Sequence, residues 1–110
     1  MKQGEIWYVD LNPTKGSEQT GFRPVVIVSG NLLNQYLNVV ITCPLTTKVK
    51  GYKGNVVLQP NKDNKLTQSS EILVFNIRSI AKERLVRKIG TIAPHELAQL
   101  KQGLDDMLRY

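Results

Sequence analysis

The order of hydrophobic patterns along the chain limits it to a small number of folds. Short apolar runs rich in β-branched and aromatic residues come first, and one segment with helical periodicity comes last. This order favours a small curled barrel with a helix packed on it over any βαβ arrangement. The expected strands cover residues 5–9, 24–29, 39–43, 55–58 and 71–75, with a weaker sixth over 85–89.

The predicted boundaries rest on a few residues with strong local preferences. Pro44 is expected to end the third strand, and Ser79 to cap a single helical turn over residues 79–83. Pro94 suits the first turn of the terminal helix. Gly103, further along this helix, destabilises it by about 1 kcal/mol relative to alanine, and packing must offset that loss. The apolar face of this helix consists of Leu97, Leu100, Leu104, Met107 and Leu108.

Composition predicts one cytoplasmic domain over residues 1–110 with a polyanionic partner. No stretch of about 18 apolar residues suggests a membrane span, and the N-terminus lacks the apolar region of a signal peptide. The single cysteine, Cys43, cannot form an internal disulfide, and with the single His95 it falls short of a zinc site. Fifteen Lys and Arg against nine Asp and Glu give a charge of +6, which favours nucleic acid. The excess lysine could instead serve solubility alone.

Two polar loops are candidates for binding. The loop over residues 12–22 is long for a hairpin and rich in glycine, and its polar groups have no obvious core to face. The loop over residues 46–54 places Lys48, Lys50 and Lys53 around Tyr52, a combination that can pair phosphate contact with base stacking. Alone this signal is weak, because lysine-rich loops are usually only solvated.

Cleavage of RNA through its own 2′-hydroxyl needs a proton acceptor, a proton donor and a cation to stabilise charge on phosphorus. A single histidine excludes a two-histidine mechanism, and His95 suits a solvated first helical turn. Arg23 is the best cation, since it precedes Pro24 at a strand start and can form two hydrogen bonds to a phosphate. Thr46 and Thr47 follow Cys43-Pro44-Leu45, where a strand meets the lysine-rich loop over residues 46–54. Taken separately, these residues also fit ordinary surface positions.

Several motifs, in order along almost the whole chain, resemble those of the MazF/PemK toxins. The segment with Gly16, Glu18 and Gln19 followed by Arg23-Pro24 is the most specific of them. The similar segments are 6–19 (IWYVDLNPTKGSEQ), 21–25 (GFRPV), 43–47 (CPLTT), 50–52 (KGY), 77–80 (IRSI) and 90–97 (GTIAPHEL).

The resemblance implies a mainly β, SH3-like barrel with a C-terminal helix, a homodimer, and metal-independent, sequence-specific cleavage of single-stranded messenger RNA without any cofactor. It also implies a toxin role, with an acidic antitoxin that covers the RNA site. The family's catalytic arginine and threonine fall on Arg23 and Thr46, and its loop glutamate on Glu18. We expect RNA contacts from Lys15, Gln19, Thr47, Lys48, Lys53, Asn76 and Arg78.

The chain departs from the family pattern at two positions. Many members carry an acidic residue before the amide position, where this chain has Phe75, and some carry a histidine where it has Ser17. Glu18 is therefore the best remaining base candidate. The alternatives are a gyrase poison of the same fold and an inactive relative that binds only nucleic acid and antitoxin. The presence of Arg23 and Thr46 within their motifs favours the nuclease.

Overall fold

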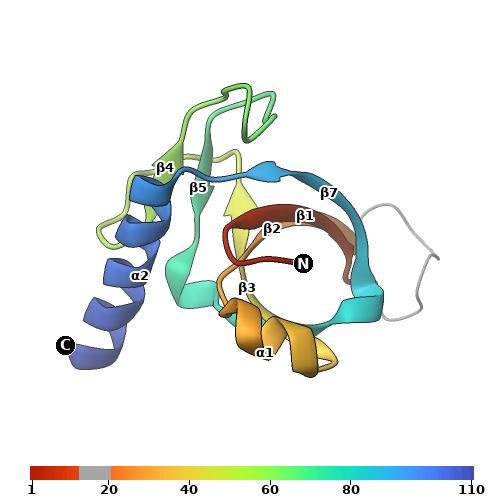
Figure 1. The fold of residues 1–110 in the computed structure, drawn as a ribbon. Helices are drawn as coiled ribbons and strands as arrows, with labels where there is room; N and C mark the ends of the chain where they lie inside the picture. The colour runs from red at the N-terminus through yellow and green to blue at the C-terminus, as the bar shows by residue number, and fades with distance from the viewer. Residues whose placement is uncertain (13–20) are drawn as a thin grey trace.

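The computed structural model describes residues 1–12 and 21–110. In this part of the chain one antiparallel sheet of seven strands curls into a partly closed barrel, with the C-terminal helix α2 beside β4 and β5 (Figure 1). The strand order is β4-β5-β3-β2-β1-β7, and β6 also pairs with β3. The mainly β fold with a C-terminal helix predicted from the sequence is therefore confirmed.

The elements follow each other closely along the chain. The strands are β1 (Glu5–Asp10), β2 (Phe22–Ile27), β3 (Val39–Thr46), β4 (Val56–Leu58), β5 (Ser70–Ile72), β6 (Arg78–Ala81) and β7 (Leu85–Thr91). The helices are α1 (Asn31–Tyr36) and α2 (Pro94–Arg109), with 3₁₀ turns η2 (Val74–Asn76) and η3 (Lys82–Arg84). No helix among the described residues has the length and apolar character needed to cross a membrane.

The sheet buries apolar residues in two clusters. The smaller cluster consists of Val9, Val25 and Ile80, with Trp7, Leu11 and Leu85 packed against it. The larger cluster is built around Ile6, Val26, Cys43, Leu58, Ile72 and Leu100, so α2 contributes directly to the core. Val25 and Val26 belong to different clusters because successive side chains of a strand point to opposite faces.

Pro44 does not end the third strand as predicted, because β3 continues through it to Thr46. Val25 of β2 lies opposite Pro44 of β3. Beyond this pair, β3 pairs with β5 through Leu45 and Ile72. The carbonyl of Pro44 accepts a 2.9 Å hydrogen bond from the backbone N–H of Leu73. Proline is tolerated here because the strand exchanges partners where its missing N–H would have bonded.

The segment around Ser79 was also predicted wrongly. Ser79 lies in β6 opposite Ile41, and the helical turn η3 begins only at Lys82, after Ala81. Nor did the apolar pattern indicate α1, because Leu32 and Leu33 are exposed on this six-residue helix. Buried Asn34 holds the helix instead, by donating a 2.8 Å hydrogen bond to the carbonyl of Ser29.

The start of α2 and its glycine follow the prediction. Pro94 begins the helix, and the Oε1 atom of Glu96 accepts a 2.7 Å hydrogen bond from the backbone N–H of Ala93. A Cβ atom on Gly103 would collide with the carbonyl oxygen of Gly54. The glycine thus lets the helix approach the loop before β4 more closely than alanine would permit.

Candidate functional site

Half of the side chains predicted to act on RNA gather on a concave surface between β2, β3 and the η2–β6 segment. This β2–β3 groove has a volume of about 560 Å³, and Arg23, Thr46, Asn76 and Arg78 all line it. A smaller adjoining hollow shares Arg23 and Thr46 and adds Thr47. Two residues assigned to catalysis and three assigned to RNA binding therefore lie along one continuous surface.

Strand register explains why Arg23 and Thr46 line the same groove. Val25 and Pro44 are paired between antiparallel β2 and β3. Arg23 and Thr46 each lie two residues beyond this pair, and side chains two apart on a strand share a face. Arg23 is exposed, and its Nη1 atom donates a 2.8 Å hydrogen bond to the carbonyl of Phe22. The groove therefore offers a guanidinium and a hydroxyl from neighbouring strands.

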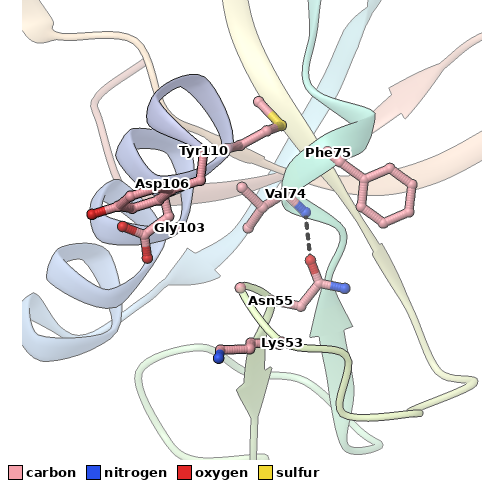
Figure 2. A pocket seen from close by; sticks show the side chains of 9 residues that line it. Lys53, Asn55, Val74, Phe75, Gly103, Asp106 and Tyr110 are labelled. Carbon is pink, nitrogen blue, oxygen red and sulfur yellow. Dashed lines mark hydrogen bonds between the residues drawn. The ribbon is translucent and has the colours of Figure 1, made fainter.

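Thr46, the last residue of β3, also leads into the loop that carries the lysines. Its Oγ1 atom accepts a 3.1 Å hydrogen bond from the backbone N–H of Lys48, which turns the chain away from β3. We call residues 47–55 the basic loop. Lys48 is exposed on this loop directly after Thr47, whereas Lys53 lines a second pocket between the loop and α2 rather than the groove (Figure 2).

Glu71 is a buried residue beside this site that the sequence interpretation missed. It lies opposite Thr46 in the β3–β5 pairing and is 1% exposed. Its carboxylate accepts hydrogen bonds from the backbone of the basic loop. Burial alone would raise the pKa of Glu71, but hydrogen bonds from Asn55 and from the backbone amides of Lys50, Gly51 and Tyr52 lower it to about 2. The available signal is a glutamate at the head of a predicted strand, directly before the apolar residues 72–75, since a charge buried there needs partners.

Other predicted site residues lie elsewhere. Lys15, Glu18 and Gln19 fall outside the described residues. Phe75 is 63% exposed and lines the second pocket, so the side chain at the position where relatives carry an acid does not line the groove. In the described part of the chain, no three His, Cys, Asp or Glu side chains lie together as metal ligands would.

Comparison with known proteins identifies the family. Residues 2–108 match the family described as PemK-like, MazF-like toxin of type II toxin–antitoxin system. The chain belongs to this family. The Mycobacterium tuberculosis protein named endoribonuclease MazF9 is 39% identical over 94% of this chain and 92% of that protein. Endoribonuclease toxin MazF of Escherichia coli is 36% identical over 96% of this chain and 91% of that protein.

The similarity extends to solved structures of the family. An endoribonuclease from a mycobacterial species, solved in complex with its cognate antitoxin, superposes with a TM-score of 0.81 at 25% identity, covering 98% of this chain and 94% of that one. The family and the enzyme class predicted from the sequence, endoribonuclease, are thus confirmed. These comparisons do not favour a gyrase poison.

Proposed function

We propose that this chain, acting as one domain over residues 1–110, is the toxin of a type II toxin–antitoxin module. It cuts single-stranded messenger RNA at a short sequence motif and needs no metal ion. The observation that carries the proposal is the β2–β3 groove, in which Arg23 and Thr46 face a common space beside Asn76 and Arg78. An enzyme with this substrate works in the cytoplasm.

In the proposed reaction the 2′ oxygen of the RNA bonds to phosphorus while the bond from phosphorus to the 5′ oxygen breaks. One proton leaves the 2′ oxygen and one reaches the 5′ oxygen. Arg23 stabilises the charge that builds up on the phosphate oxygens, since a guanidinium stays protonated and can bind two of them. Thr46 orients the phosphate or relays a proton, and Glu18 accepts the 2′ proton.

RNA binding divides between the groove and the loops. Asn76 and Arg78 lie beside the catalytic pair, which suits contacts to the nucleotides that flank the cut. Thr47, Lys48 and Lys53 extend the proposed path along the basic loop, and Lys15 and Gln19, which lie between β1 and β2 in the sequence, contribute further contacts. The charge of +6 supports phosphate binding, because each neutralised phosphate releases counterions.

The proposed partners are an acidic antitoxin and a second copy of the chain. The mycobacterial relative was solved with its cognate antitoxin, which supports the same kind of partner here. An acidic segment laid over Arg23 and Arg78 would neutralise the side chains that hold RNA. We propose that the active form is a homodimer, as the family resemblance implies.

The proposal predicts that purified protein cleaves a long single-stranded RNA in excess EDTA, with new 5′ ends at one short motif. Arg23→Lys keeps the charge but loses the planar two-pronged contact, so kcat should fall about 10²–10³-fold with RNA affinity nearly retained. Arg109→Lys is the matched control, since Arg109 is exposed on α2 and pairs with Asp105 at 3.2 Å.

Two results would contradict this function. One is loss of cleavage in EDTA that a divalent ion restores. The other is an Arg23→Lys protein that is folded yet as active, and as toxic on expression, as the parent.

A further inference from the structure

One buried carboxylate, that of Glu71, accepts hydrogen bonds from the backbone of the basic loop. The Oε1 atom of Glu71 accepts from the backbone N–H groups of Lys50 at 2.7 Å and Gly51 at 2.9 Å. The Oε2 atom accepts from Tyr52 N–H at 3.1 Å and from Asn55 Nδ2 at 2.8 Å. The φ of +68° at Gly51 is the left-handed conformation that lets consecutive amides converge on one anion.

Asn55 extends this network to the turn η2. While its Nδ2 atom donates to Glu71, its Oδ1 atom accepts a 3.0 Å hydrogen bond from the backbone N–H of Val74 (Figure 2). Val74 begins the turn η2, which ends at Asn76 in the groove. Two hydrogen bonds through one side chain therefore connect the carboxylate to the turn that carries a proposed RNA contact.

We infer that Glu71, acting through Asn55, is a positioning residue for RNA, because it fixes the basic loop and the η2 turn relative to each other. The inference rests on the proposed function, since it names how the same surface is held ready for its substrate. Glu71 does not contact the groove itself, but its strand partner Thr46 lines it. The side chains of Lys48 and Lys50 stay exposed because the loop is held by its backbone.

The chemistry of the contacts requires a carboxylate. Four donors converge on two oxygens, and a glutamine would point its own N–H₂ group at two of those donors. Glu71→Gln should therefore release part of the loop while it preserves side-chain volume. By charge alone the same substitution should strengthen RNA binding, because it removes a negative charge from a phosphate-binding surface. Positioning and simple charge thus predict opposite changes in affinity.

The test measures RNA cleavage by the full-length protein and by Glu71→Gln. Glu83→Gln, at an exposed position of η3, is the matched control. Positioning predicts a KM for RNA raised about tenfold and a kcat within about twofold, because Arg23 and Thr46 are retained. A merely structural role would lower the folded fraction, which reduces the apparent kcat and leaves KM unchanged. Unchanged or tighter RNA binding by Glu71→Gln would overturn the inference.

Exchanging the two side chains sharpens the test. In the double variant Glu71→Gln/Asn55→Asp the donor and acceptor trade places, so the link between positions 71 and 55 forms again. We expect it to recover about threefold of the lost affinity, measured as a double-mutant cycle. If the double variant recovers no RNA affinity, Asn55 does not connect Glu71 to the RNA-binding surface.

Two further measurements keep the outcomes distinct. Should Glu71→Gln fail to fold, Asn55→Ala breaks the same link at a partly exposed position and should raise KM about threefold. Should the parent fail to cut RNA, the proposed function is wrong, and hydrogen exchange at the amides of Lys50, Gly51 and Tyr52 still tests the network. Exchange that is no faster in Glu71→Gln than in the parent would overturn it.

Discussion

Glu5 and Glu71 are both nearly buried glutamates, yet they do different work in the fold. Glu5 lies at the start of β1, opposite Thr91 of β7, and its carboxylate accepts from Trp7 Nε1 at 2.9 Å and pairs with Lys88 Nζ at 3.2 Å. Glu71 instead accepts three backbone amides of one loop. The first carboxylate binds Trp7 of its own strand, Lys88 of β7 and the backbone N–H of Lys2. The second binds three consecutive amides and so gives an irregular segment one conformation.

The difference has a physical cause. A strand already satisfies its backbone groups through its neighbours, so a carboxylate beside it can bind cations and indole N–H groups. A loop has no such partners, and its amides need an acceptor wherever water is excluded. Glu71 supplies that acceptor without using the lysine side chains, which remain exposed.

The largest difference between the two regions should appear when each carboxylate is deleted. Glu71→Ala leaves three loop amides and the Asn55 amide without their acceptor, and should lower the free energy of unfolding by about 3 kcal/mol. Glu5→Ala should cost about 1 kcal/mol, because Lys88 is half exposed and returns to water. Urea denaturation of both variants measures the two values. Equal losses of unfolding free energy would mean that the carboxylate bound to backbone amides stabilises the fold no more than the other one.

Acid should distinguish the two regions next. The pKa of Glu71 is about 2 in the folded protein against an ordinary 4.5, so the unfolded chain takes up the proton first as pH falls. Its stabilising contribution is complete above about pH 4.5 and is lost between there and pH 2. The pKa of Glu5 is also lowered, because hydrogen bonds from Trp7 and Lys2 and the charge of Lys88 outweigh burial.

Unfolding free energies of the parent, Glu71→Gln and Glu5→Gln across that range test this linkage. Both variants should lose less stability on acidification than the parent, and Glu71→Gln should show the weakest dependence on pH. A Glu71→Gln curve parallel to that of the parent would show that the carboxyl titrates normally.

The same contrast explains what the sequence could predict. Runs of β-branched and aromatic residues predict strands such as β1 and β2, and the helical period of Leu97, Leu100 and Leu104 predicts α2. The family motifs also singled out Arg23 and Thr46, which line one groove in the structure. These features depend on local patterns that a single sequence displays.

The missed features depend on partners distant in the sequence. Pro44 can stay inside β3 because β5 replaces β2 as the neighbour, which no local pattern reveals. The short helix α1 depends on the bond from Asn34 to Ser29 rather than on an apolar face. Glu71 directly precedes an apolar run, but its donors lie about twenty residues earlier in a loop. The sequence showed that it needed partners without naming them.

The basic loop is also held from outside, where Gly103 of α2 approaches the carbonyl of Gly54. Gly103→Ala should improve helix propensity by about 1 kcal/mol, yet the collision with Gly54 should outweigh that gain. We expect a net loss of about 1–2 kcal/mol in unfolding free energy. Gln102→Ala, at an exposed neighbouring position, is the control. A stabilised Gly103→Ala protein would show that the loop yields easily and that Glu71 alone determines its position.

The smallest expected effect completes the comparison from the side of Glu5. Glu5→Gln keeps an acceptor for Trp7 Nε1 and removes the ion pair with Lys88, so it should cost about 0.5 kcal/mol or less. Because Lys88 is half exposed, this loss should shrink further as salt screens the pair. Glu5 lines neither the groove nor the adjoining hollow, so KM and kcat for RNA should stay at parental values. Urea denaturation at low and high salt, with RNA cleavage measured on the same preparations, tests both statements. A raised KM in Glu5→Gln matching that of Glu71→Gln would mean that any lost carboxylate perturbs RNA binding, and the distinction between a scaffold carboxylate and a positioning carboxylate would fail.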